Sequence, residues 1–158
     1  MEKNMTKQER IKLITMTILI ATASIFASAG FAAEKPQVIY DFPITRIIDG
    51  DTVAFEANFL PEPLKQELSI RVFGVDTPEK SWRGSCDAEK ALGDEASSFT
   101  KLFIASGTVI QVSIMSWDKY GGRVLGDVIV DGVSLRYALL ENGYAREYFG
   151  DKKESWCD

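Results

Sequence analysis

The order of the strand and helix patterns constrains the fold of this chain more than any other feature. Between residues 87 and about 105, apolar residues recur at steps of four, four, three and four, which places them on one face of a helix. The residues on this predicted face are Ala88, Leu92, Ala96, Phe99 and Phe103. Gly107 supplies a stop at the C-terminal end of the helix. Strand patterns lie on both sides of it.

Five strands and a second helix are predicted around this first helix. Residues 44–55 are rich in Ile, Val and Thr and are interrupted at Asp49-Gly50, which predicts a hairpin of two strands. Runs of strands separated by one helix do not fit the alternating pattern of a doubly wound parallel sheet. In order, the predicted elements are the hairpin over 44–55, a strand over 68–75, the helix over 87–105, strands over 109–115 and 124–130, and a helix over 135–142 that Gly143 ends.

This order predicts an α+β fold that is mainly β, namely a five-stranded Greek-key barrel of the OB type with helices packed against it. The length of 158 residues allows one domain with a real core and is too short for two. Hydrophobic residues make up 46% of the chain and charged residues 26%, which is the mix of a soluble globular protein. We therefore expect one barrel domain.

The first 33 residues follow a different pattern. Basic residues precede an apolar stretch from Leu13 to about Ala33, and small residues crowd its end, which is the arrangement of a bacterial secretory signal. Ala27-Ser28-Ala29 fits the small-x-small cleavage rule best, and cleavage after Ala32 or Ala33 also fits. The alternative is an uncleaved membrane anchor, because about 20 apolar residues can span a bilayer.

Threonine and serine residues dilute the apolar stretch, which favours cleavage over anchoring. We therefore expect a signal peptide over 1–33 and an exported domain over 34–158, secreted or periplasmic. If the signal stays uncleaved, the domain is instead anchored in the membrane and faces outward. The sequence implies no stable protein partner, and a monomer is expected.

The exported domain is acidic. Removal of residues 1–33 leaves 14 Lys and Arg residues against 21 Asp and Glu residues, a formal net charge of −7. Such a domain gains no long-range attraction for a phosphate polymer, which counts against tight, sequence-independent nucleic-acid binding as its main task. A nuclease remains compatible with this charge if its few cations gather at one site and a metal ion neutralises its carboxylates.

Cys86 and Cys157 are the only cysteines of the chain. An even number of cysteines in an oxidising compartment favours a disulfide. Such a bridge would close a loop of about 70 residues and stabilise the fold by about 4 kcal/mol in the chain-entropy model. The alternative is two unpaired buried thiols. Because the chain contains no histidine, the two cysteines cannot form an ordinary zinc site.

Three short segments combine charged side chains with turn residues. Asp49-Gly50-Asp51-Thr52 places two carboxylates beside a tight turn, and Asp76-Thr77-Pro78-Glu79 places two more after the predicted third strand. Arg71 lies five residues before Asp76, where it can pair with these acids or face a bound phosphate. The third segment is a glycine-rich turn over 118–123. Each segment alone is more typical of an ordinary turn with solvated charges.

Taken together, the segments are similar to the staphylococcal (thermo)nuclease family over about residues 44–149. The matching blocks are Ile48-Asp49-Gly50-Asp51-Thr52-Val53, the run from Arg71 to Glu79, the turn from Asp118 to Arg123 with Leu125, and Glu141-Asn142-Gly143-Tyr144-Ala145. The resemblance implies an OB-fold barrel, one calcium ion, and hydrolysis of phosphodiester bonds in DNA and RNA that leaves 3′-phosphates.

The resemblance also implies a role for each matched residue. Asp51 and Asp76 match the family's carboxylate ligands for Ca²⁺, and Thr77 matches the position that gives the ion a backbone carbonyl. Glu79 matches the residue that activates the attacking water. Asp49 matches an acid that supports the metal ligands. An all-oxygen set suits the hard Ca²⁺ ion, and magnesium or manganese could also occupy it.

Further matches concern the substrate. Arg71 and Arg123 match the two arginines that grip the phosphate, for which planar and always charged guanidinium groups are well suited. Lys119 and Tyr120 match residues that touch the terminal phosphate, although an extra glycine separates them from Arg123. Either of two residues fits the aromatic stacking position, Tyr148 or Phe149. Because the chain has no histidine, a general base must be a carboxylate, and Glu79 is the one at the matching place.

This chain differs from the family after Phe149. Trp156-Cys157 stands where the type enzyme has a long C-terminal helix, and this ending resembles a shorter bacterial branch with a cysteine on each side. The resemblance thus implies a Cys86–Cys157 bridge, which we expect to replace that helix as a brace. Two other functions stay open: an exported OB-fold module that binds an oligonucleotide or another anionic ligand without catalysis, and a structural calcium-binding domain.

Overall fold

The computed structural model of the chain describes residues 38–119 and 121–157. The predicted signal peptide and Tyr120 lie outside these residues. Residues Pro36–Asp158 form one compact unit. The strands are β1 (Ile39–Tyr40), β2 (Ile44–Ile47), β3 (Thr52–Glu56), β4 (Glu67–Val72), β5 (Val75–Asp76), β6 (Ile110–Trp117), β7 (Arg123–Val130), β8 (Val133–Ser134) and β9 (Arg146–Glu147); the helices are the 3-10 turn η1 (Ser81–Arg83), α2 (Asp87–Ser106) and α3 (Leu135–Glu141).

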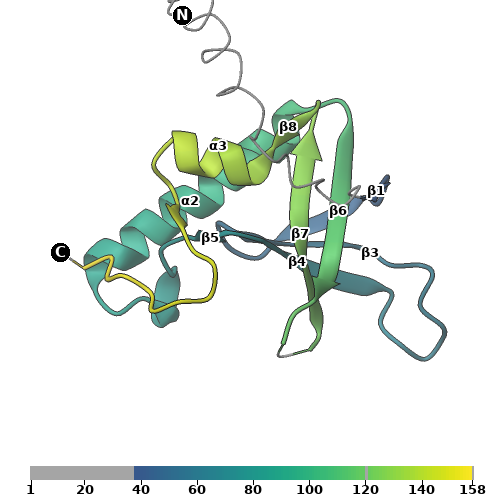
Figure 1. Cartoon of the computed structure of the whole chain (residues 1–158), viewed down its shortest axis with the longest axis horizontal. Coiled ribbons are helices and arrows are strands. Elements are labelled where there is room, and N and C mark those ends of the chain that lie inside the picture. The colour runs from purple at the N-terminus through teal and green to yellow at the C-terminus, as the bar shows by residue number, and fades with distance from the viewer. Residues whose placement is uncertain (1–37, 120, 158) are drawn as a thin grey trace, which may run out of the picture. The chain divides into compact units, whose positions relative to one another are not determined.

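Seven of these strands form one curled sheet. Their order is β1-β6-β7-β4-β3-β2, with β8 beside β7 (Figure 1). The two ends of this order, β1 and β2, are consecutive in the chain and separated only by residues 41–43. This three-residue segment therefore brings the two edges of the curled sheet close together, as in a barrel. The α+β, mainly β OB-type barrel predicted from the element order is confirmed.

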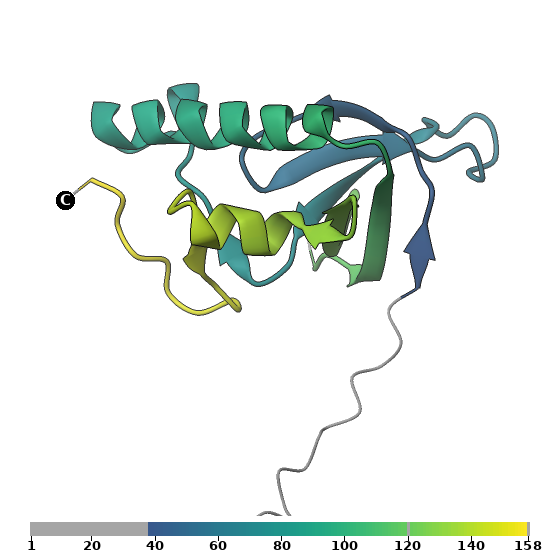
Figure 2. The same cartoon turned by 90° about the horizontal axis from the view of Figure 1, so that it is seen from above.

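The five predicted strands correspond to β2, β3, β4, β6 and β7. Within this sheet the neighbouring strands are antiparallel except β4 and β7, which are parallel. The short strands β1, β5, β8 and β9 were not predicted. Both predicted helices form, and α2 and α3 lie alongside each other next to the barrel (Figure 2). No helix among the described residues is long and apolar enough to cross a membrane.

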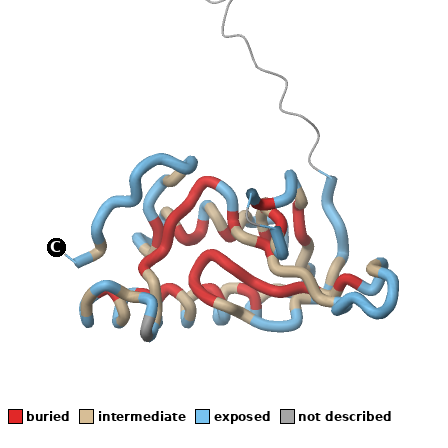
Figure 3. Tube along the Cα trace, turned by 90° about the horizontal axis from the view of Figure 1, so that it is seen from below, coloured by how far each residue is buried: buried red, intermediate tan, exposed pale blue. Residues whose placement is uncertain are grey.

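The core lies inside the barrel and under the helices (Figure 3). Alternate residues of β7 are buried, as expected for a strand with one face toward a core. Fully buried side chains include Phe55, Ile70 and Leu139, each of which contributes roughly 1.5–3 kcal/mol by leaving water. At Gly126 a Cβ atom would lie 1.9 Å from the carbonyl oxygen of Ser113, so only glycine lets β6 and β7 approach there.

The buried face of α2 differs from the predicted one. Ala88 and Leu92 are exposed, whereas Phe99 and Phe103 are only partly buried. Ala96 is buried as predicted, and the other buried residues of α2 are Glu89, Gly93, Thr100 and Ile104. The reason is a close backbone approach, because this side of α2 packs directly on loops that carry polar groups. Small and hydrogen-bonding side chains fit such a contact better than large apolar ones do.

The predicted strand over 68–75 also ends early. β4 stops at Val72, and the chain turns at Gly74, whose φ of +81° is readily adopted only by glycine. After the turn, β5 leaves the barrel sheet and pairs with β9 in a separate two-stranded sheet. This break brings Asp76 beneath the C-terminal segment, where Asp76 is opposite Arg146 in the strand register.

Candidate metal and phosphate site

Three carboxylates and one arginine meet where β3 begins and where β4 and β5 end. Arg71 on β4 is paired with Thr52 on β3, so that its side chain reaches the neighbouring Asp51. Its Nη2 atom lies 2.9 Å from Asp51 Oδ2 and 3.4 Å from Asp76 Oδ1. Glu79 follows in the loop after β5. The two buried carboxylates therefore face one shared centre of positive charge.

Asp51 is 2% exposed, and the hydroxyl of Thr52 donates a 2.8 Å hydrogen bond to its Oδ1 atom. Burial raises the pKa of Asp51 to about 7; the charge of Arg71 opposes this shift and the nearby charge of Asp49 adds to it. Asp49 is itself buried, with Oδ2 3.7 Å from Arg83 Nη1. Its Oδ1 atom has no hydrogen-bond partner among the described residues. This cluster has spare oxygen lone pairs that a cation could use.

The loop between β2 and β3 is shaped by its contact with α2. Gly50 lacks the positive φ that a tight Asp-Gly hairpin turn would need. A Cβ atom at Gly50 would instead lie 2.9 Å from the Cβ of Ala96 and 3.0 Å from Thr77 Oγ1. The hydroxyl of Thr100 donates a 2.6 Å hydrogen bond to the Gly50 carbonyl oxygen. Glycine is therefore needed here to seat the Asp49–Asp51 loop on the helix.

Glu79 is held through its backbone while its side chain stays partly exposed. Its amide donates a 3.4 Å hydrogen bond to Oε1 of Glu89, a buried residue on the first turn of α2. At Gly93, one turn further along, a Cβ atom would lie 2.6 Å from the carbonyl carbon of Glu79. The side chain of Glu79 is 33% exposed. The helix thus fixes the loop and leaves the Glu79 carboxylate facing the site.

The C-terminal segment covers Asp76 from the other side. The indole nitrogen of Trp156 donates a 3.3 Å hydrogen bond to Asp76 Oδ2, and the Lys153 ammonium lies 2.6 Å from Asp76 Oδ1. Cys157 is joined to Cys86 by a disulfide, which confirms the predicted bridge. The bridge therefore holds the end of the chain at the N-terminal end of α2, next to the site (Figure 1).

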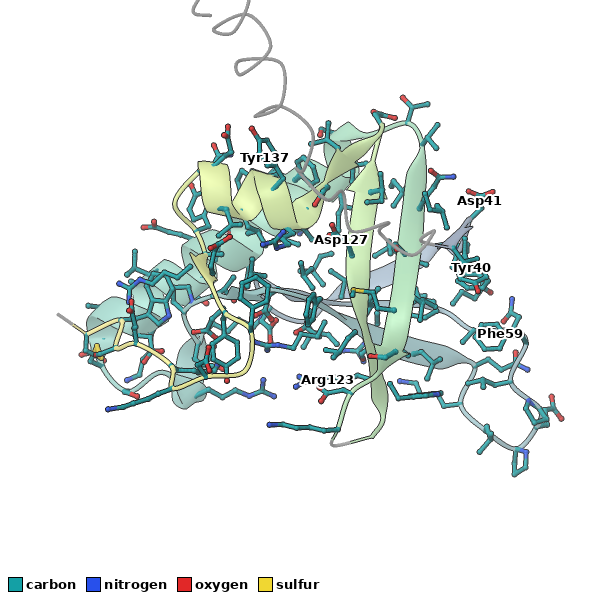
Figure 4. All side chains as sticks on the ribbon, viewed as in Figure 1. Tyr40, Asp41, Phe59, Arg123, Asp127 and Tyr137 are labelled. Carbon is teal, nitrogen blue, oxygen red and sulfur yellow. A yellow bond between two sulfur atoms is a disulfide. The ribbon has the colours of Figure 1, made fainter. Side chains whose placement is uncertain are left out.

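A pocket of ≈ 630 Å³ opens beside these carboxylates. Cationic side chains are concentrated in it although the domain is acidic overall. Its charged lining residues are Asp49, Arg71, Glu79, Arg83, Asp118, Lys119, Arg123 and Lys153, and its aromatic ones are Phe73, Trp117, Tyr148 and Phe149. Arg123 lies at the start of β7, beside the turn that joins β6 to β7 (Figure 4), where its Nε atom pairs with the buried carboxylate of Asp118.

Most of the predicted site residues are brought together. Asp49, Asp51, Arg71 and Asp76 form one cluster with Glu79, and the other predicted pocket residues are Lys119, Arg123, Tyr148 and Phe149. Thr77 is buried beside Asp76. Within residues 38–119 and 121–157, no group of three or more His, Cys, Asp or Glu side chains is arranged to hold a metal ion by itself. A metal would thus need backbone or water oxygens in addition to the carboxylates.

Sequence reasoning missed Lys153, Trp156, Arg83 and Asp118. The predicted pairing of Cys86 with Cys157 could have indicated that the C-terminal segment lies near the start of the first helix. Nothing in the local pattern of that segment points to Lys153 or Trp156, because it has neither strand nor helix periodicity.

Comparisons with known proteins agree with this fold and site. Residues 69–156, more than half of the chain, match the family described as Staphylococcal nuclease homologue. This match contains Arg71, Asp76, Glu79 and Arg123, whereas Asp51 precedes it. The OB-type barrel, with carboxylates and arginines at one pocket, agrees with this family match. The chain belongs to the staphylococcal nuclease homologue family.

Two similar proteins come from Bacillus subtilis (strain 168). Endonuclease YhcR is 34% identical over 116 residues, which cover 70% of this chain and 9% of that protein. Endonuclease YncB is 36% identical over 122 residues, which cover 75% of this chain and 53% of that protein. Probable staphylococcal-like nuclease CAN1 from Oryza sativa subsp. japonica is 31% identical over 87 residues, 55% of this chain and 23% of that protein. The chain thus spans at most about half the length of these relatives.

Proposed function

We propose that this chain is a calcium-dependent nuclease that hydrolyses phosphodiester bonds in DNA and RNA and leaves 3′-phosphates. The observation that carries the proposal is the contact of one arginine, Arg71, with two buried carboxylates at the edge of a cationic pocket. Membership of the family and the two relatives named as endonucleases support the same activity.

The residues at this centre suit a hard divalent cation. Asp51 and Asp76 are nearly fully buried oxygen donors, and the unpartnered Asp49 Oδ1 atom leaves further negative charge behind them. We infer that Asp51, Asp76 and the Thr77 carbonyl would hold Ca²⁺, with waters completing the shell. When bound, the ion would supply positive charge that stabilises the phosphoryl oxygens as negative charge develops on them.

The side chains around the pocket have complementary tasks in this proposal. Arg71 and Arg123 bind and orient the phosphate, and Asp118 holds the Arg123 guanidinium in place. Glu79 accepts the proton of the attacking water, whose oxygen bonds to phosphorus as the bond to the 5′ oxygen breaks, and the departing 5′ oxygen takes a proton from water to become a hydroxyl. Lys119 and Tyr120 would contact a terminal phosphate, and Tyr148 or Phe149 would stack on a base.

The proposal also includes export of the domain from the cytoplasm. Residues 1–33 would act as a signal peptide, so that the domain works outside the cytoplasm as a monomer. The Cys86–Cys157 disulfide supports an oxidising compartment. A domain of net charge −7 would then attract its substrate only close to the cationic pocket, so we expect weak binding with a modest salt dependence, because few phosphates would contact cationic side chains.

The test is cleavage of denatured DNA and of RNA by the purified protein, with Ca²⁺ and with chelator, followed by identification of the product ends. Glu79→Gln should lower the rate by about 10²–10⁴-fold without unfolding the protein. Glu95→Gln, on the exposed side of α2, is the matched control and should keep the wild-type rate. A folded Glu79→Gln variant with the wild-type rate would show that another group is the base.

The cleavage assay, together with a binding measurement, also tests the two competing functions. The acidic surface is compatible with a module that binds an oligonucleotide or another anionic ligand and does not cleave it. Binding of a labelled oligonucleotide without any Ca²⁺-dependent product would support that function over the nuclease. Calcium binding with neither cleavage nor oligonucleotide binding would support a structural calcium domain.

A further inference from the structure

The last residues of the chain are fastened over the carboxylate cluster at several independent points. Cys157 is bonded to Cys86. The guanidinium of Arg146 stacks 3.9 Å from the centre of the Trp156 ring and donates a 2.8 Å hydrogen bond to the carbonyl oxygen of Ser155. Trp156 in turn binds Asp76. We call residues 148–157 the C-terminal strap. On the other side of Lys153, the amide of Tyr148 donates a 3.1 Å hydrogen bond to the Gly74 carbonyl oxygen, so the position of the lysine is restricted from both sides.

Lys153 places its charge on two groups of the proposed site. Its ammonium lies 2.6 Å from Asp76 Oδ1 and 3.7 Å from Glu79 Oε1, and it also lines the pocket. The side chain is 44% exposed, whereas the Asp76 side chain is only 6% exposed. The lysine is therefore a charged partner of Asp76.

We propose that Lys153 is a built-in counter-cation of Asp76 and Glu79 that a divalent ion displaces, so that this residue sets the metal affinity of the site. The inference rests on the proposed function. The same oxygen, Asp76 Oδ1, contacts both Lys153 and Arg71. A divalent ion at an ordinary ligand distance of about 2.3–2.6 Å from this carboxylate would repel an ammonium held equally close. The ammonium must then leave.

Trp156 has a different relation to the same carboxylate. It is an uncharged donor and binds the other oxygen, Oδ2, so it can keep orienting Asp76 while a cation exchanges at Oδ1. Lys153 cannot diffuse away after displacement because the disulfide and Arg146 hold the strap. Its ammonium thus competes at a high effective concentration, as a tethered ligand does.

The test is a Ca²⁺ titration of the oxidised protein by calorimetry, without substrate. Lys153→Gln should bind Ca²⁺ about three- to tenfold more tightly than wild type. The competing Lys153–Asp76 ion pair joins a partly exposed group to a buried one, so its strength lies between that of an exposed pair and that of a buried pair. Lys153→Arg keeps the charge and should stay close to wild type. Lys152→Gln, which removes an exposed charge from the same strap, is the matched control for general electrostatics.

A second measurement uses the contact of Trp156 with Asp76. Ca²⁺ binding should change the tryptophan emission of wild type, and Trp156→Phe should lose most of this change. The inference is overturned if Lys153→Gln binds Ca²⁺ no more tightly than wild type, or if Lys152→Gln tightens binding equally. In either case the proposed nuclease function still stands, provided that the wild type binds Ca²⁺ and cleaves. A wild type that neither binds Ca²⁺ nor cleaves overturns the proposed function and this inference together.

Discussion

The Nη2 atom of Arg71 lies 2.9 Å from the Oδ2 atom of Asp51, and this contact follows directly from the register of the barrel. Thr52 on β3 is opposite Arg71 on β4, so the residue before Thr52 comes within reach of the guanidinium. Because Arg71 is 15% exposed and lines the pocket, its remaining nitrogen atoms can face a phosphate.

Arg71→Lys should therefore impair catalysis more than stability. An ammonium is a single point of charge and cannot contact two carboxylates and a phosphate in the fixed planar geometry of a guanidinium. We expect the cleavage rate to fall by about 10²–10³-fold, with a small change in melting temperature. Arg46→Lys, at an exposed ion pair with Glu67, is the matched control. An equal loss of rate in both variants would contradict a specific role for Arg71.

Much of this site could be predicted because its residues lie in short segments at the ends of neighbouring strands. Asp51, Arg71 and Asp76 keep their spacing in any barrel with this strand order, and the structure brings them together. Glu79 follows in the next loop. The local pattern of each segment is typical of an ordinary turn, so the site was predicted from the resemblance of the combined segments to the family.

The rest could not be predicted because it depends on contacts between distant segments. The buried side of α2 is set by the backbone of two loops, so Gly93 and Thr100 face inward, whereas periodicity placed the neighbouring Leu92 and Phe99 on the buried face. Lys153 and Trp156 reach Asp76 only because Cys157 is bonded to Cys86, 71 residues away in the sequence. Apolar periodicity cannot identify such positions, since it reports neither close backbone contacts nor crosslinks.

The pKa of Asp51 predicts how stability changes with pH in the absence of metal. Burial raises this pKa from 3.8 to about 7. Between these two pH values, Asp51 therefore keeps its proton in the folded protein and loses it in the unfolded chain. The free energy of unfolding in chelator should therefore contain a contribution from Asp51 that is full below about pH 4 and is lost as the pH rises to 7. Asp51→Asn should remove this slope, which urea unfolding at several pH values would measure.

Calcium should reverse this dependence. The ion requires the ionised carboxylate, so its stabilising effect should increase as the pH rises from 6 to 8. The increase in melting temperature caused by a fixed Ca²⁺ concentration is the quantity to compare at the two pH values. An increase that is equal at both, or larger at pH 6, would contradict Asp51 as a ligand with this pKa.

The disulfide predicts a response to reducing agent. It closes a loop across 71 residues, which in the chain-entropy model stabilises the fold by about 4 kcal/mol. Reduction should lower the melting temperature by more than about 10 °C, because one kcal/mol corresponds to several degrees in a domain of this size. A double Cys86→Ser, Cys157→Ser variant should melt like the reduced protein and should not respond to reductant. An unchanged melt on reduction would show that the bridge is not a brace.

Gly93 links the packing of α2 to the placement of Glu79. In an isolated helix, Gly93→Ala would stabilise by about 1 kcal/mol, because glycine is a poor helix former. Here the added Cβ atom would lie 2.6 Å from the carbonyl carbon of Glu79 and 2.6 Å from the nitrogen of Lys80, which are backbone atoms that cannot move aside as a flexible side chain would. Relief of this overlap costs about 1–3 kcal/mol and requires the loop that carries Glu79 to shift.

We therefore expect Gly93→Ala to lower both the melting temperature and the cleavage rate, since a proton acceptor displaced by even about 1 Å loses much of its effect. Glu95→Ala, on the exposed side of the same helix, should raise the melting temperature slightly or leave it unchanged, with full activity. Helix propensity alone would favour Gly93→Ala more than Glu95→Ala, so a lower melting temperature of Gly93→Ala reports its contact with the Glu79 loop. A Gly93→Ala protein that melts higher than wild type and cleaves at the wild-type rate would show that α2 does not position Glu79.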